Sequence, residues 1–165
     1  MENTGEQLIA SWNLLYHLPQ DTDRSAASYK YIMENIDTID KVITISKSIP
    51  ENIVKFCMLS VMKVGIIPSW EDVKNRNGGS FSYKVINKFV PVVWNELMYS
   101  LCGHTLTKEK QHMELVNGVT ISPKKNFCII KIWLYDCSLQ DTDCFITINN
   151  LGNSGVFFKK HVPEY

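Results

Sequence analysis

The residues best suited to chemistry in this chain lie between Gly65 and Phe81. Pro68 fixes its own φ and the Gly78–Gly79 pair permits a sharp turn, so we expect one stiff loop here. Trp70 and Glu71 stand side by side in this loop, combining a large aromatic surface with a carboxylate. Such a pair can stack on a flat ring and accept hydrogen bonds from its edge, which suits a positively charged, purine-like ligand. The alternative is an ordinary core tryptophan beside a solvated turn.

The whole stretch resembles the signature of the translation initiation factor 4E family, which binds the 7-methylguanosine cap at the 5′ ends of messenger RNA. The signature reads Pro-x-Trp-Glu-Asp, followed by Lys-Asn and Gly-Gly. Its matches here are Pro68, Trp70, Glu71, Asp72, Lys74, Asn75, Gly78 and Gly79. The resemblance runs from Leu8 to His161. It implies a protein that binds capped messenger RNA in translation initiation or its control, without a metal or cofactor.

The resemblance implies that two aromatic rings enclose the cap base. Trp70 and Tyr29 match the two faces, with Tyr31 as the alternative to Tyr29 if the preceding loop is gapped differently. Methylation at N7 makes guanine a cation, which gains about 0.5 to 2 kcal/mol from each aromatic face. Glu71 would accept charge-assisted hydrogen bonds from N1 and N2 of the base. Trp133 would lie against the N7-methyl group.

Lysines near the hairpin before Trp133 would hold the cap phosphates. Lys124 falls on the first basic position of the family, whereas Asn126 and Ile129 replace the next two. We therefore expect phosphate binding to be weaker or shared with further lysines. The candidates are Lys125, Lys159 and Lys160. The alternative is that these lysines are solvated surface charges. His161 falls near a family histidine close to the base, or is a plain surface histidine.

The resemblance also implies a partner surface on the convex side of the domain. Initiation scaffolds and 4E-binding proteins dock there through a Tyr-x-x-x-x-Leu-hydrophobic motif. Val42 and Glu96 match the family. Ser46 stands where a tryptophan is expected, and Asn95 and Tyr99 replace apolar residues. We expect scaffold binding to be weakened or altered.

Hydrophobic periodicity predicts the elements that position these residues. Strands are expected over 8–16, 29–36, 54–62, 80–86, 115–121, 127–135 and 155–160. A helix of two to three turns capped by Asp40 is expected, and a longer one framed by Pro91 and Gly103. The segment 136–154 indicates an irregular connector. The predicted class is α+β: a curved antiparallel sheet backed by helices on its convex face, with the concave face open for ligand.

Alternation within two of the strands predicts which side chains share a face. In 127–135 the face formed by Cys128, Ile130, Ile132 and Leu134 is uniformly apolar, so Lys131 and Trp133 should look toward the open side. In 29–36 the same alternation puts Tyr29, Tyr31 and Met33 on one side.

Bulk properties indicate one domain over residues 1–165, with 1–7 flexible. The 165 residues are 45% hydrophobic, and 17 Lys and Arg balance 17 Asp and Glu, which excludes a broad basic surface for nucleic-acid backbone. Five cysteines without a Cys-x-x-Cys spacing argue against a disulfide framework and a zinc ribbon. The polar N-terminus and the lack of an apolar run of about 18 residues complete the expectation of a cytoplasmic protein, or a nuclear one.

Binding is favoured over catalysis. The sequence has no Walker loop, no glutamate-rich decapping motif, and no Cys-His or Ser-His arrangement near the signature, so we do not expect an enzyme. The alternatives are a repressor or decoy that occupies caps without recruiting a scaffold, a nucleotide-processing enzyme, and an interaction protein that kept the fold and lost the ligand. The divergence from the family pattern fits an unusual organism or a virus.

Overall fold

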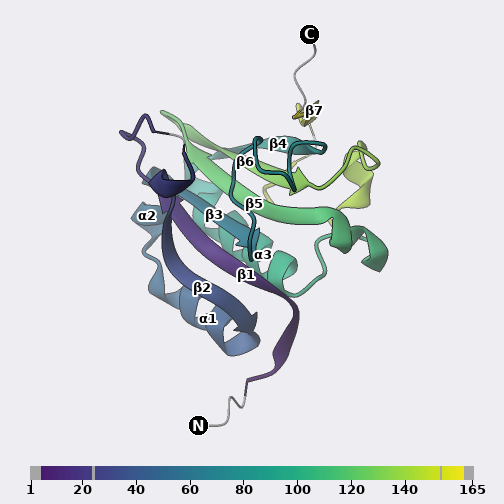
Figure 1. Ribbon diagram of the computed structural model, residues 1–165. Helices are drawn as coiled ribbons and strands as arrows, with labels where there is room; N and C mark the ends of the chain where they lie inside the picture. The colour runs from purple at the N-terminus through teal and green to yellow at the C-terminus, as the bar shows by residue number, and fades with distance from the viewer. Residues whose placement is uncertain (1–4, 24, 153, 162–165) are drawn as a thin grey trace.

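The sheet determines the arrangement of the whole molecule. The computed structural model describes residues 5–23, 25–152 and 154–161. In these residues, seven strands form one sheet in the order β2-β1-β3-β5-β6-β4-β7, and every neighbouring pair runs antiparallel. Figure 1 shows the α-helices packed on one face of the curved sheet, and none of these α-helices lies on the other face. The predicted α+β class is confirmed.

The bounds of the elements are as follows. The strands are β1 Gln7–His17, β2 Lys30–Thr38, β3 Met58–Lys63, β4 Gly79–Ile86, β5 Val116–Pro123, β6 Phe127–Leu134 and β7 Phe157–Lys160. The helices are α1 Ile39–Ser48, α2 Glu51–Phe56 and α3 Val90–Cys102. Short 3-10 helices cover Ala26–Ser28, Asn87–Phe89, Lys110–Leu115 and Thr142–Cys144. No helix in these described segments is long and apolar enough to cross a membrane.

Helix α3 has the limits that the sequence predicts. Pro91 lies in its first turn, where the missing N–H is not needed, and the Gly103 N–H donates to the carbonyl of Tyr99 at its end. Its buried residues include Val93, Trp94, Leu97, Met98 and Leu101. The predicted apolar face of β6 belongs to the same core, and its four members are at most 1% exposed. This main core lies on the helical side of the sheet and leaves the other face open.

One helix prediction and one strand prediction are wrong in their details. Helix α1 is capped by Thr38, whose hydroxyl accepts from the Lys41 N–H at 3.3 Å, and Asp40 lies inside the first turn. The expected strand 54–62 begins as helix α2, which follows Pro50, and becomes extended only at β3. A short apolar run carries no periodicity that separates helix from strand, so the two elements merge in the sequence pattern.

A bulge in β2 overturns the expected common face of its side chains. Tyr31 pairs with Leu15, but Met33 already pairs with Leu14, which leaves Ile32 as the extra residue between them. Met33 therefore packs on the main core, whereas Tyr29 lies on the open side of the sheet.

Segments outside the main strands and helices are fastened to the rest of the fold by backbone hydrogen bonds. The Glu6 carbonyl accepts from the Ile39 N–H and Gln7 begins β1, so the expected flexibility of residues 1–7 does not extend to these two; residues 1–4 lie outside the described part. The described part of the connector 136–154 has no long element. It is fastened by the pairing of Thr107 with Phe145. All five cysteines are free.

Candidate functional site

Asp72 folds the loop that joins β3 to β4. One oxygen of its carboxylate accepts from the Ile67 N–H and the other from the Lys74 N–H, both at 2.9 Å. Both oxygens are therefore occupied by the backbone of the loop. The acidic residue after Glu71 in the signature has a structural task, because it closes the turn that carries Trp70 and Glu71.

Asn75 fastens this loop to the sheet. Its side chain is fully buried, and the amide nitrogen donates to the carbonyls of Ile67 and Ser69 at 2.9 Å each. The amide oxygen accepts from Nδ2 of Asn117 on β5, also at 2.9 Å, and Asn117 donates to the Lys74 carbonyl as well. The sequence offered Asn75 only as a motif match, and gave no signal for Asn117.

Trp70 and Glu71 are presented outward by this fastened loop. The indole of Trp70 is 48% exposed, and the Glu71 carboxylate has no hydrogen bond or ion pair among the described residues. The backbone of Glu71 is held at both ends. Its N–H donates to the Ser69 hydroxyl at 3.2 Å, and its carbonyl accepts from the Arg76 guanidinium at 3.0 Å. An exposed ring and an unengaged carboxylate are therefore adjacent on a restrained backbone.

A second, smaller apolar cluster lies on the open face of the sheet. It consists of Leu15, Tyr29, Met62, Ile66 and Trp133. Tyr29 and Trp133 are each 7% exposed, and the Trp133 Nε1–H donates to the Thr120 hydroxyl at 3.0 Å. The ring of Tyr29 also contacts His17, with 5.0 Å between ring centroids. The structure brings Tyr29 and Trp133 into one cluster and leaves Trp70 outside it.

Tyr31 offers the more exposed ring on the same face. Its Cα partner is Leu15, a member of the small cluster, yet the Tyr31 side chain is 52% exposed at the edge of the sheet. Tyr29 and Tyr31 therefore both face the open side, one covered and one accessible. The two alternatives that the sequence left open stay open.

His161 joins the end of β7 to the site. Its ring lies on Trp133, with 4.9 Å between centroids, and its Nδ1 lies 2.7 Å from the Asn75 carbonyl. A carbonyl only accepts, so Nδ1 carries the hydrogen and Nε2 is the unprotonated nitrogen of the neutral ring. Nε2 is buried and has no partner in the described part of the chain. Burial lowers the pKa of His161, against the opposing effect of the Asn75 hydrogen bond.

Strand register separates the lysines that the sequence grouped together. Lys159 pairs with Ser80, which also pairs with Trp133, so Lys159 lies on the open face. Lys160 pairs with Gly79, whose other partner is the core residue Leu134, so Lys160 points to the opposite face. Successive residues of a strand point to opposite sides of the sheet. Lys160 is therefore not brought to the site.

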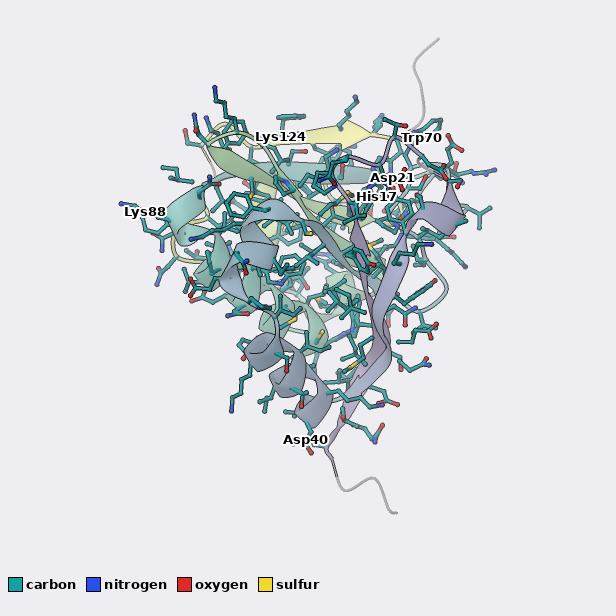
Figure 2. The ribbon with its side chains drawn as sticks, turned by 90° about the vertical axis from the view of Figure 1, so that its left-hand side faces the viewer. His17, Asp21, Asp40, Trp70, Lys88 and Lys124 are labelled. Carbon is teal, nitrogen blue, oxygen red and sulfur yellow. The ribbon has the colours of Figure 1, made fainter. Side chains whose placement is uncertain are left out.

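The hairpin lysines lie at one end of the open face. Lys124 and Lys125 are exposed in the turn between β5 and β6, which the Lys124 N–H closes by donating to the Phe127 carbonyl at 2.8 Å. Figure 2 shows Lys124 and Trp70 at the same end of the molecule, opposite Asp40.

The described residues contain no group of acidic, histidine and cysteine side chains that could hold a metal ion.

The residues expected to bind partners lie on the helical side, in mixed environments. Val42 is 4% exposed and belongs to the core, and Glu96 is half-buried. Ser46 on α1 is hydrogen-bonded to the Tyr99 hydroxyl on α3. Asn95 lines a groove of about 450 Å³ between the three helices, together with Ile45, Ser46, Pro50, Val92 and Met98.

Comparison with known proteins gives consistent matches. The sequence model of the family described as eukaryotic initiation factor 4E matches residues 7–154. The Candida albicans eukaryotic translation initiation factor 4E is 26% identical over 144 residues, which cover 82% of this chain and 67% of that protein. A eukaryotic translation initiation factor 4E homolog of Acanthamoeba polyphaga mimivirus is 40% identical over 62 residues, which cover 38% of this chain and only 23% of that protein.

Solved structures match the fold. Ascaris suum eIF4E-3 in complex with an m7G cap aligns with a TM-score of 0.71 at 19% identity, covering 81% of this chain and 76% of that one. A schistosome eIF4E complexed with m7GpppG and 4E-BP aligns with a TM-score of 0.72 at 20% identity, covering 82% of this chain and 75% of that one.

Proposed function

The chain belongs to the eukaryotic initiation factor 4E family, and we propose from this premise that it binds the 7-methylguanosine cap of messenger RNA in translation initiation or its control. The observation that carries the proposal is the loop that holds Trp70 and Glu71 side by side. Trp70 is 48% exposed, the Glu71 carboxylate has no partner among the described residues, and Asp72 and Asn75 restrain the backbone beneath them.

The two exposed side chains supply complementary parts of base recognition. Trp70 stacks on the methylated base, whose positive charge strengthens the contact with the ring. Glu71 accepts hydrogen bonds from N1 and N2, which are better donors in the charged base than in guanine. Because the carboxylate has no partner among the described residues to give up, its hydrogen bonds to the ligand replace those to water.

The second aromatic face of the sandwich comes from Tyr29 in this proposal. Tyr29 lies in the same cluster as Trp133, which the N7-methyl group would approach. The ring of Tyr29 is covered in the structure, so ligand binding must expose this ring by a side-chain rotation or a shift of the preceding loop. Tyr31, which is already exposed on the same face, is the competing candidate.

Fluorescence titration with 7-methyl-GTP and with GTP tests the proposal directly. Stacking on Trp70 should quench tryptophan emission, and 7-methyl-GTP should bind at least about tenfold more tightly than GTP, because only the methylated base is cationic. Equal affinity for the two nucleotides contradicts the proposal. Capped RNA recovered unchanged after incubation supports binding alone, whereas release of the cap nucleotide supports an enzyme.

Partners of the helical face form the second part of the proposal. Solved relatives include complexes with 4E-BP and with the 4E-binding protein Mextli, and we extend this class of partner to α1 and α3 here. Ser46 and Asn95 make this surface more polar than the apolar residues expected at these positions would make it. We therefore propose weakened or altered binding of such proteins in the cytoplasm.

A further inference from the structure

Lys131 lies on the open face of the sheet, on β6 between β5 and β4. Its Cα partners are Ser82 on β4 and Thr120 on β5, both with small hydroxyl side chains. It stands two residues before Trp133 on the same face, and Thr120 accepts the indole hydrogen bond of Trp133. The ammonium group is therefore attached next to the ring that we assign to the cap base.

Two further lysines surround Lys131 without a compensating carboxylate. Lys159 lies on the open face of β7, and Lys124 lies in the hairpin that joins β5 to β6. Burial lowers the pKa of Lys131, and the charges of Lys159 and Lys124 lower it further. None of the three forms an ion pair in the described residues, where the salt bridge present joins Lys41 to Asp37.

The half-buried ammonium group of Lys131 beside two like charges is an unfavourable arrangement when no anion lies between them. An anion placed between the three groups removes the repulsion and satisfies their hydrogen-bond donors. Ile129 occupies the position of a family phosphate-binding residue, and Lys131 lies two residues further along the same face, nearer to Trp133. The lost cation is thus replaced by one closer to the base.

We propose that Lys131, together with Lys124 and Lys159, binds the phosphate chain of the nucleotide whose base is held by Trp70 and Glu71. This inference rests on the proposed function, because it takes the position of the base from it. The ligand class is a 7-methylguanosine 5′-di- or triphosphate. Lys160 takes no part, since it lies on the opposite face of β7.

The test compares Lys131→Met with the unmodified protein. The probes are 7-methyl-GTP and the nucleoside 7-methylguanosine, which has no phosphates. The variant should bind 7-methyl-GTP about ten- to a hundredfold more weakly, because hydrogen bonds to charged groups are lost. Its affinity for 7-methylguanosine should be unchanged. Its melting temperature without ligand should equal or exceed that of the unmodified protein, because the methionine removes a repelled charge and keeps the packing.

Adjacent residues of β7 provide a matched pair. Lys159→Met should weaken 7-methyl-GTP binding, whereas Lys160→Met, one residue along and on the other face, should not. If Lys131→Met does not fold, this pair decides the inference: equal affinities of the two β7 variants overturn it. In a folded Lys131→Met, unchanged affinity for 7-methyl-GTP overturns it as well.

The controls separate this inference from the proposed function. An unmodified protein that binds 7-methyl-GTP and GTP equally overturns the function, whatever Lys131 does. A protein that discriminates the methylated base but tolerates Lys131→Met keeps its function and loses the phosphate assignment. Lys131→Arg, which retains the charge, should recover most of the triphosphate affinity.

Discussion

His161 donates the hydrogen on its Nδ1 to the backbone carbonyl of Asn75 across 2.7 Å. The Asn75 side chain holds the loop that presents Trp70 and Glu71, so this bond fastens His161, which directly follows β7, to the same loop. A second bond, from the His161 N–H to the Gly78 carbonyl at 2.9 Å, acts at the other end of the loop. The loop that carries Trp70 and Glu71 is therefore restrained by Asn117 of β5 on one side and by His161, which follows β7, on the other.

Glu71→Gln should remove discrimination for the methylated base. The amide keeps the shape but loses the charge and one acceptor, at a cost of about 1.5 to 3 kcal/mol of binding free energy. Stability should change by less than about 0.5 kcal/mol, because Glu71 is exposed and its carboxylate has no partner in the described chain. Calorimetric titration with 7-methyl-GTP measures the first effect, and Glu96→Gln on the helical side is the control. Wild-type affinity in Glu71→Gln would remove Glu71 from the site.

Alanine at Trp70, Tyr29 and Tyr31 should identify the two stacking faces. Trp70→Ala should nearly abolish both binding and fluorescence quenching, with little effect on stability since the ring is 48% exposed. Tyr29→Ala should weaken binding and also lower the free energy of unfolding by about 2 to 4 kcal/mol, because its ring is buried. Tyr29→Phe keeps the ring and isolates the stacking effect. Normal binding by Tyr29→Ala, with a loss in Tyr31→Ala, would move the second face to Tyr31.

His161 should make stability depend on pH. Burial, and then the charges of Lys131 and Lys159, lower the pKa of His161 from its ordinary 6.5. The unfolded chain therefore binds the proton first as pH falls, and the contribution of the neutral ring to stability is complete above about 6.5 and lost as pH drops through the lower folded-state pKa. Urea unfolding from pH 7 to pH 5 should show a steeper loss in the unmodified protein than in His161→Gln.

His104 serves as the internal reference for this measurement. Burial lowers its pKa too, but it is retained in both proteins, so its contribution cancels in the difference. Parallel stability profiles for the two proteins would show that the His161 ring is not held neutral by the fold.

Peptides with the Tyr-x-x-x-x-Leu-hydrophobic motif should bind the helical face weakly. Their affinity should be lower than for typical family members by a factor of roughly some tens or more. Burying a tryptophan side chain contributes roughly 2 to 3 kcal/mol to such an interface, and Ser46 offers none of that area. Ser46→Trp with Asn95→Leu should recover part of the affinity. The substitution also breaks the Ser46–Tyr99 hydrogen bond, so Tyr99→Phe is the control for that loss. Tight binding by the unmodified protein would mean that other residues carry the interface.

The sequence predicts the class of the fold and the main features of the site because these depend on local patterns. The apolar alternation of 127–135 places Lys131 and Trp133 on the open face, as found. Pro91 and Gly103 mark the limits of α3 for reasons confined to a few residues. The loop signature places Trp70 and Glu71 together because they are neighbours in the chain.

The remaining features depend on contacts between distant segments. The bulge at Ile32 follows from how β2 fits β1, and no residue type near it indicates an extra residue. The separation of Lys159 from Lys160 follows from the register of β7 on β4. The role proposed for Lys131 follows from Ser82 and Thr120 beside it and from the position of Lys159 on the same face. Asn117, which completes the fastening of Asn75, lies 42 residues away in sequence.

The order of the strands also governs when the ligand surface can form during synthesis. The loop with Trp70 and Glu71 ends in β4, whose only neighbours in the described sheet are β6 and β7, both made later. At about 5 to 20 residues per second, a ribosome needs several seconds to proceed from Trp70 to Leu134. During that interval β4 has no strand to pair with, and Asn75 has no Asn117. A nascent chain therefore acquires the surface that would recognise a messenger only after Asn117 and β6 have been synthesised.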